Sequence, residues 1–224
     1  APLWSDKKII LVSDTHLGIV RSQKFMRKVV NLINEQRPDI VLFAGDMIDG
    51  PNFDFVKSLT ELNNLKTEMG IFYTPGNHEA YSRQRESFYK EVVNYTNMLV
   101  DKVVVVNGTQ IIGLDYKIEN KAETAKRLEA CGYKKEMPSI VIMHDPKNMQ
   151  ALSDAGASLV VSGHTHLGQF FPINFIVRAM YKNFAYGATK TGTTTSVTTC
   201  GVGTAMSPVR LGTNPEIVVI KVTA

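Results

Sequence analysis

The first half of the chain alternates short apolar runs with segments whose apolar side chains recur at helical spacing. The apolar runs lie at residues 9–12, 39–43 and 71–73. The helix-like segments lie at about residues 22–35, 53–65 and 84–95. Apolar runs of this length are typical of buried strands, and the helical spacing is typical of amphipathic helices. The alternation predicts a mostly parallel sheet with helices on its faces.

The second half of the chain has shorter elements. Residues 103–114 form two apolar runs around Asn107-Gly108, a dipeptide that favours a hairpin turn. Further strands are predicted at residues 140–143, 159–161, 194–199 and 216–222, and helices at about 122–130 and 148–155. Two sheets, each covered by helices on its outer face, suit this order of elements.

Composition predicts one globular domain. The chain has 224 residues, of which 44% are hydrophobic, so we expect residues 1–224 to fold as a single domain. The charged fraction of 21% argues against disorder. The net charge of +4 comes from scattered basic residues without the dense stripe of a dedicated nucleic-acid binder, so no specific nucleic-acid partner is expected. The charge suits an anionic substrate or an anionic membrane surface.

Signals for a cellular compartment are few. No apolar stretch reaches the ~18 residues of a membrane span, and no signal peptide is visible. The chain begins at Ala1 instead of a methionine, which leaves room for a targeting or anchoring segment outside it. Cys131 and Cys200 do not make a disulfide framework, so they leave the redox compartment open.

Five short segments place polar side chains directly after apolar runs. They are Ser13-Asp14-Thr15-His16, Gly45-Asp46-Met47-Ile48-Asp49, Gly76-Asn77-His78-Glu79, Met143-His144-Asp145 and Gly163-His164-Thr165-His166. Any one of them alone is more typical of a turn or a cap. Together they use all five histidines of the chain, and the carboxyl ends of strands meet at one edge of an α/β sheet. The combined pattern predicts a cluster of metal ligands at that edge.

These five segments, in this order, make the chain resemble the calcineurin-like metallophosphoesterase superfamily, and the resemblance runs from Ile9 to Val222. The resemblance implies an α/β fold of two mixed β-sheets packed face to face and flanked by helices, a four-layer α/β/β/α sandwich. It implies one divalent metal ion held by Asp14, His16 and His166, a second held by Asn77, His144 and His164, and Asp46 shared between them. It also implies that His78 acts on the substrate and that Asp49 orients His78.

The chemistry of the residues supports these implied roles. Two cations about 3.5–4 Å apart need a shared anion, which a carboxylate such as Asp46 supplies. Imidazole and carboxylate ligands suit manganese, which we expect first, and also zinc, iron or nickel. If Asn77 and His78 lie on an extended loop, their side chains point in different directions, so His78 can protonate a leaving group. Asp49 would fix the tautomer of His78, or else cap a local turn.

Several neighbouring residues leave alternatives open. Glu79 and Asp145 would support a ligand or be solvated neighbours, and we expect solvated neighbours. The glycines that precede the polar side chains, at positions 45, 76 and 163, either permit close approach to a crowded site or simply end a strand.

The segment from Gly163 to Pro172, with the downstream Gly201-Val202-Gly203-Thr204 and Pro208-Val209-Arg210-Leu211-Gly212, is similar to the bacterial YkuE-like branch of the family. Leu167 replaces a glycine that is usual in that branch. The branch contains membrane-anchored and exported phosphoesterases, so we expect a bacterial protein that is membrane-associated or exported, with a cytoplasmic location as the alternative. The resemblance also implies a phosphorylated small-molecule or lipid-linked substrate, and membrane association through a segment absent from this chain.

The apolar residues 170–177 follow the last histidine segment. We weigh a lipid-facing flap against a helix or loop packed over the core, and slightly prefer the packed element. Arg178, Lys182 and Arg210 would contact phosphate or be surface charges.

The predicted function is a metal-dependent phosphoric ester hydrolase. A metal-activated hydroxide would attack a phosphodiester or phosphomonoester, with His78 assisting the leaving group. A pyrophosphatase acting on a UDP-linked acylated sugar or another lipid-linked substrate is the alternative, because some YkuE-like relatives do this. A non-catalytic binding scaffold on the same fold is less favoured because every ligand position is intact, and a nuclease is less favoured because no basic stripe interleaved with aromatics is present.

Overall fold

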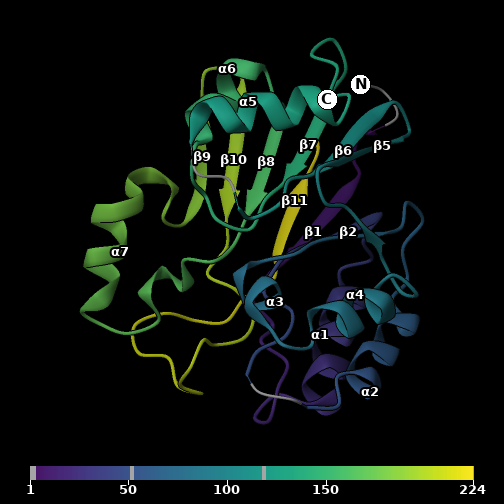
Figure 1. The fold of residues 1–224 in the computed structure, drawn as a ribbon, viewed down its shortest axis with the longest axis vertical. Coiled ribbons are helices and arrows are strands. Elements are labelled where there is room, and N and C mark those ends of the chain that lie inside the picture. Colours follow the sequence, from purple (N-terminus) through teal and green to yellow (C-terminus); the bar gives the residue numbers. More distant parts are fainter. Residues whose placement is uncertain (1–3, 51–52, 118–119, 224) are drawn as a thin grey trace.

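The computed structural model describes residues 4–50, 53–117 and 120–223, and the strands in this part form two mixed sheets (Figure 1). The first sheet has the order β11-β1-β2-β3-β4. Its strands are β1 (Lys8–Val12), β2 (Ile40–Ala44), β3 (Ile71–Thr74), β4 (Asn97–Met98) and β11 (Val218–Lys221). Strands β1 to β4 run parallel, and β11 is antiparallel to β1.

The second sheet has the order β5-β6-β7-β8-β10-β9. Its strands are β5 (Lys102–Val106), β6 (Thr109–Gly113), β7 (Ser139–Ile142), β8 (Leu159–Ser162), β9 (Gly187–Thr191) and β10 (Thr194–Thr198). The four central strands are parallel, whereas β5 and β9 are antiparallel edges. The predicted hairpin around Asn107-Gly108 is confirmed as the β5–β6 turn.

The alternation of side chains along a strand builds the layers. In β1, Ile9 and Leu11 pack into the cluster between the two sheets, whereas Ile10 and Val12 pack into the cluster on the outer face. Every residue of β2 is buried as well, because that strand is covered on both faces.

The helices cover the two outer faces (Figure 1). Helices α1 (Gln23–Glu35), α2 (Val56–Leu59) and α4 (Arg85–Val92) pack on the first sheet, and α5 (Lys121–Ala130) and α6 (Met149–Ala155) pack on the second. Helix α1 illustrates the burial, because it hides Met26, Val29, Val30 and Ile33 against the sheet. The predicted four layers of helix, sheet, sheet and helix are thereby confirmed.

Two predicted elements differ in the structure. The helix predicted at 53–65 is the short α2 followed by a 3₁₀ helix, η2 (Thr60–Asn64). The apolar segment 170–177 does not pack over the core: it leads into helix α7 (Ile173–Tyr181), which contains no buried residue. Helix α7 is preceded by the 3₁₀ helix η3 (His166–Gly168) and followed by η4 (Lys182–Phe184), and it projects from the side of the molecule (Figure 1).

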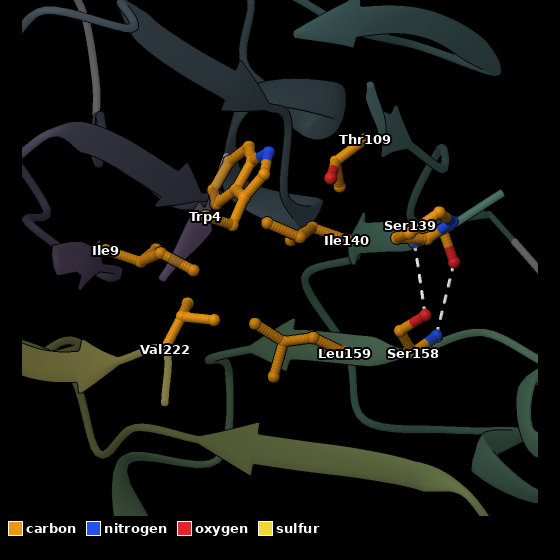
Figure 2. A pocket seen from close by; sticks show the side chains of 9 residues that line it. Trp4, Ile9, Thr109, Ser139, Ile140, Ser158, Leu159 and Val222 are labelled. Atoms are coloured by element: carbon orange, nitrogen blue, oxygen red, sulfur yellow. Dashed lines mark hydrogen bonds between the residues drawn. The ribbon is translucent and has the colours of Figure 1, made fainter. Parts of the chain in front are cut away.

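An apolar cavity of about 140 Å³ lies between the two sheets (Figure 2). Its walls include Trp4, Ile9, Ile140, Leu159 and Val222. Ser139 in β7 and Ser158, directly before β8, also line it. Each donates its backbone amide to the hydroxyl of the other at 3.2 Å, and these two bonds tie the strands together. Most of these residues lie near the amino ends of the parallel strands, so the cavity belongs to the core and is far from the carboxyl ends, where the predicted site residues lie.

Candidate metal centre

The structure brings all nine predicted site residues to the edge of the sandwich formed by the carboxyl ends of the parallel strands. Asp14 and His16 follow β1, Asp46 and Asp49 follow β2, Asn77 and His78 follow β3, His144 follows β7, and His164 and His166 follow β8. The residues therefore come from both sheets. Backbone bonds join the segments, for example from the His16 amide to the Asp46 carbonyl at 3.0 Å and from the Gly163 amide to the His144 carbonyl at 3.0 Å.

Asp14, His16 and His166 form the first group of converging donor atoms. The Nε2 atoms of His16 and His166 lie 3.0 Å apart. Oδ1 of Asp14 lies 3.3 Å from Nε2 of His166 and 3.7 Å from Nε2 of His16. All three side chains are buried, and the Asp14 Oδ1 atom has no hydrogen-bond partner. A buried carboxylate oxygen between two imidazole nitrogens is an expensive arrangement without a cation, so it fits a divalent metal ion.

Asp46, His144 and His164 form a second group. Oδ2 of Asp46 lies 3.0 Å from Nε2 of His144, which is also 3.1 Å from Nδ1 of His164. The side-chain oxygen of Asn77 lies 3.1 Å from the same His144 nitrogen. Nδ1 of His144 lies 2.7 Å from the Ala44 carbonyl, to which it donates. Nε2 is thus left without a proton in neutral His144, as a metal ligand requires.

His78 and Asp49 form a hydrogen-bonded pair at the side of these groups. Nδ1 of His78 lies 2.8 Å from Oδ1 of Asp49, and its Nε2 lies 3.9 Å from Oδ2 of Asp46. The other Asp49 oxygen lies 3.4 Å from Nδ1 of His16, so one carboxylate contacts two histidines. The expected extended loop is wrong, because Asn77 begins helix α3 (Asn77–Tyr81). The Asn77 and His78 side chains nevertheless point to different partners, His144 and Asp49, so the expected difference in direction holds.

A cavity of about 230 Å³ opens next to His78. It is lined by Asp49, Asn77, His78, Tyr81 and Ser82. The His78 side chain is partly exposed there, whereas the side chains of Asp14 and His144 are fully buried. A substrate group bound in this cavity would meet the His78 imidazole and the carboxylate that orients it.

Much of the backbone at the centre is in the left-handed region. Five of the seven predicted ligands have φ between 46° and 68°: Asp14, His16, Asp46, His164 and His166. Such values are uncommon for residues with a side chain and cost free energy, so the surrounding structure must impose them. Strain concentrated on ligand-bearing positions is typical of a functional site.

Two glycines are required by close approach. A Cβ atom at Gly76 would lie 2.7 Å from the Asp46 amide nitrogen, and one at Gly163 would collide with the side chains of Ser13 and Asp14. In both cases the approach is closer than real Cβ atoms adopt. These glycines therefore let the segments that carry the predicted ligands pack directly against one another, which is the first of the two alternatives raised by the sequence.

Glu79 has a role that the sequence did not indicate. It was expected to be a solvated neighbour, but its side chain is fully buried. Its carboxylate accepts hydrogen bonds from the backbone amides of Asp46 at 3.0 Å, Ile48 at 2.9 Å and Gly76 at 2.7 Å. Glu79 thus holds the segment after β2 against the segment after β3. Its place in helix α3, three residues after Gly76, is the spacing of a capping box, and that spacing was the available signal.

Asp145 and Arg210 were also misjudged. Asp145 is buried, pairs with Lys147 at 2.6 Å and lies 3.8 Å from Nε2 of His164, so the expected solvated neighbour is wrong. The Arg210 guanidinium donates to the carbonyls of Cys200 at 2.7 Å and Gly201 at 3.1 Å, and its Nη2 lies 3.3 Å from Nδ1 of His166. Arg210 is therefore a structural clamp behind a predicted ligand and not a free surface charge. The separation of 44 residues hid this contact from sequence patterns.

The acidic side chains dominate the electrostatics of the centre. Burial lowers the pKa of His16, but hydrogen bonds to Asp14 and Asp49 outweigh it and raise the pKa to about 9. Burial also lowers the pKa of His144, but the negative charge of Asp46 outweighs it and the pKa rises to about 10. Both shifts have the sign expected where buried carboxylates favour a positive charge. A pair of divalent cations would supply that charge in place of protons.

Comparison with known proteins places the chain in a family. The sequence profile described as calcineurin-like phosphoesterase matches residues 7–168, so the chain belongs to the calcineurin-like phosphoesterase family. It is 32% identical to an uncharacterized metallophosphoesterase of Helicobacter pylori over 98% of the chain and 62% of that relative. It is 28% identical to the uncharacterized metallophosphoesterase YkuE of Bacillus subtilis, over 95% of the chain and 77% of YkuE. The predicted family and the YkuE-like likeness are confirmed.

Another relative is named as a transmembrane protein. The chain is 28% identical to the Bos taurus transmembrane protein with metallophosphoesterase domain, over 96% of the chain and 53% of that protein. The chain thus spans between half and two thirds of the length of this relative and of the Helicobacter pylori one. Among the described residues of the chain, no helix has the length and apolar character needed to cross a membrane.

Solved structures share the fold. TT1561 of Thermus thermophilus superposes with a TM-score of 0.56 at 14% identity, covering 89% of this chain and 92% of that one. A dimetal phosphatase from Danio rerio superposes with a TM-score of 0.51 at 12% identity, covering 87% of each chain. At these identities the likeness concerns the fold, and the chemistry must be argued from the residues of this chain.

Proposed function

We propose that the chain is a two-metal phosphoric ester hydrolase. The observation that carries the proposal is the position of Asp46, whose Oδ2 lies 3.0 Å from Nε2 of His144 in one group and 4.0 Å from Nε2 of His16 in the other. A single carboxylate that reaches both groups suits the shared ligand of a two-metal site. Membership of the calcineurin-like phosphoesterase family supports the same activity.

In this proposal each group holds one divalent ion. Asp14, His16 and His166 would hold the first ion, Asn77, His144 and His164 would hold the second, and Asp46 would be shared. When bound, the two ions supply Lewis acidity that lowers the pKa of a water molecule and offsets the negative charge of a phosphate ester. Nitrogen and oxygen donors admit manganese, which we propose first, as well as zinc, iron or nickel.

His78 acts on the leaving group. Because Asp49 accepts from Nδ1, Nε2 is the nitrogen free to face the substrate, and protonated His78 donates from it to the departing oxygen. Burial lowers the pKa of His78, but the Asp49 hydrogen bond outweighs it and the pKa is raised, which favours the protonated imidazole. The cavity beside His78 receives the alcohol portion of the ester.

We propose a phosphodiester or phosphomonoester as the substrate. Cleavage of a lipid-linked pyrophosphate is the alternative within the same chemistry. Membrane association of the whole protein is also proposed, because a relative is named as a transmembrane protein with a metallophosphoesterase domain. A non-catalytic scaffold is less favoured, because nothing in its role would require buried carboxylates aimed at imidazole nitrogens.

The test is hydrolysis of two chromogenic substrates, a phosphate monoester and a phosphate diester. The protein is stripped of metal and resupplied with manganese, zinc, nickel or magnesium, and bound metal is counted by elemental analysis. We expect two ions per chain and metal-restored hydrolysis. Asp46→Asn should lose metal and activity, whereas His78→Asn should keep both ions and lose at least about 100-fold in kcat. Absence of metal binding by the unaltered chain would refute the proposal and favour the scaffold.

A further inference from the structure

Helix α7 presents its apolar residues to solvent. Phe175, Ile176 and Met180 are 61%, 59% and 69% exposed, and none of the nine residues of α7 is buried. The half-buried positions, Asn174, Val177 and Tyr181, form one stripe that faces the body of the protein. Surface helices normally show the reverse pattern, as α1 does with its four buried apolar side chains. An exposed apolar helix of this kind marks an interaction surface.

The exposed apolar surface continues onto a second segment. Phe171 stacks edge-on against Phe175 at 5.8 Å between ring centroids, and the Phe171 amide donates to the Leu211 carbonyl at 2.8 Å. Both Phe171 and Leu211 are exposed. We call Phe171, Phe175, Ile176, Met180 and Leu211 the apolar ridge. Helix α7, which carries three of these five residues, projects from the side of the sandwich in Figure 1.

The segment that carries the apolar ridge contains basic residues and no acidic ones. Residues 155–215, which contain the whole ridge, include no Asp or Glu, although acidic residues make up 21 of the 224 in the chain. The basic residues Arg178 and Lys182 lie on α7 and directly after it, and both are exposed. Asp145 lies at the half-buried Tyr181, on the stripe of α7 that faces the body of the protein. Exposed apolar side chains next to the exposed Arg178 and Lys182 complement a surface that is apolar inside and anionic outside.

We propose that the apolar ridge inserts into the surface of a membrane that carries anionic lipid headgroups, with Arg178 and Lys182 at headgroup level. Exposed Phe, Ile and Met side chains on a projecting helix suit a deformable apolar medium. A second copy of the chain would bring the same basic residues face to face in a symmetric contact, which like-charge repulsion opposes.

The ridge is tied to the metal centre. Helix α7 follows η3, which begins at His166, and the ring of Tyr181 lies 6.4 Å from the ring of His164. A groove of about 400 Å³ beside Tyr181 is lined by Lys121, Lys147 and Lys182 among others. Insertion of the ridge would therefore hold the centre close to the headgroups. The docking surface goes beyond the proposed hydrolysis and does not depend on it.

Vesicle binding tests the proposal. The metal-loaded chain is sedimented with vesicles of phosphatidylcholine, either pure or with about one third phosphatidylglycerol. Phe175→Asp with Ile176→Asp should weaken binding to the mixed vesicles by at least about 100-fold, because two apolar side chains leave the bilayer. The matched control, Leu32→Asp with Val105→Asp, changes two exposed apolar residues elsewhere and should bind like the unaltered chain. Arg178→Gln and Lys182→Gln should each weaken binding about five-fold on anionic vesicles.

The outcomes separate this proposal from the proposed function. Hydrolysis of a soluble chromogenic ester is measured on every variant, and the Phe175→Asp/Ile176→Asp variant should retain it while losing vesicle binding. No binding by the unaltered chain, or equal binding by both double variants, would overturn the membrane proposal even if hydrolysis is normal. Concentration-dependent dimerisation that the Phe175→Asp/Ile176→Asp variant abolishes, without vesicle binding, would overturn it in favour of a second copy.

Discussion

Replacement of Glu79 by glutamine tests whether this buried carboxylate holds the predicted metal-binding segments together. One carboxylate oxygen accepts from the amides of Asp46 and Gly76, and the other accepts from the amide of Ile48. Glutamine has the same shape but only one acceptor oxygen. If that oxygen keeps the two bonds to Asp46 and Gly76, the glutamine NH₂ group faces the Ile48 amide, and two donors confront each other at about 2.9 Å.

The magnitude follows from the bonds that change. A hydrogen bond to a charged acceptor contributes about 1.5–3 kcal/mol, and a buried donor left unsatisfied costs about 1–3 kcal/mol. Burial and the nearby Asp46 charge raise the pKa of Glu79, so removing its charge returns part of this loss. We expect Glu79→Gln to lower the free energy of unfolding by about 2–3 kcal/mol, or roughly 4–12 °C in Tm for a chain of this size.

The assay is urea and thermal unfolding in the presence of a chelator, followed by metal counting without it. Working metal-free separates fold stability from metal affinity. Glu86→Gln is the matched control, because Glu86 is exposed on α4 and the chemical change is the same. A Glu79→Gln variant that unfolds within about 0.5 kcal/mol of the unaltered chain and binds both ions would show that the three amide bonds do not need a carboxylate.

Three further predictions follow from the site and the packing. The raised pKa of His78 means that its acid form is lost as pH rises through that pKa, so Asp49→Asn should move the alkaline limb of the pH–rate profile to lower pH. Gly163→Ala should destabilise the chain by about 1–3 kcal/mol in urea unfolding and reduce metal content, because its methyl group meets Ser13 and Asp14. Hydrogen bonds from Arg27 lower the pKa of Glu61, so this pair stabilises the fold above about pH 4.5, and the stabilisation is lost as pH falls. Glu61→Gln should therefore flatten the acidic part of the curve of unfolding free energy against pH.

The fold was predictable where hydrophobic pattern and burial agree. Strand β2 is buried on both faces, and α1 buries one face. Their hydrophobic patterns therefore predict a buried strand and an amphipathic helix directly. The predicted ligands were equally visible, because each follows a strand and the carboxyl ends of parallel strands meet. The pattern failed at α7, since an apolar run is ordinarily a core element. Only the three-dimensional structure shows that, among the described residues, none of α7 is buried.

The packing around the predicted ligands was harder to foresee than the convergence of these side chains at one edge of the sheets. Glu79 stands next to His78, and its burial depends on how the segment after β2 packs against the segment after β3. Arg210 lies 44 residues after His166, in the segment between β10 and β11 that contains no helix or strand. Such contacts are fixed by tertiary packing and leave no periodic trace in the chain. The sequence therefore indicates the type of chemistry more readily than the framework that orients it.

The centre also links the two sheets energetically. Asp14, His16 and Asp46 come from the first sheet, whereas His144 and His166 come from the second, and the sandwich must close before their donor atoms converge. Closing it buries carboxylates beside one another and forces ligand residues into the left-handed region, and both effects oppose folding. Hydrogen bonds from backbone amides to Glu79, and the packing between the sheets, offset that opposition before any ion binds. In the proposed two-metal site, an arriving cation would therefore relieve repulsion among donor atoms that the fold has already brought together.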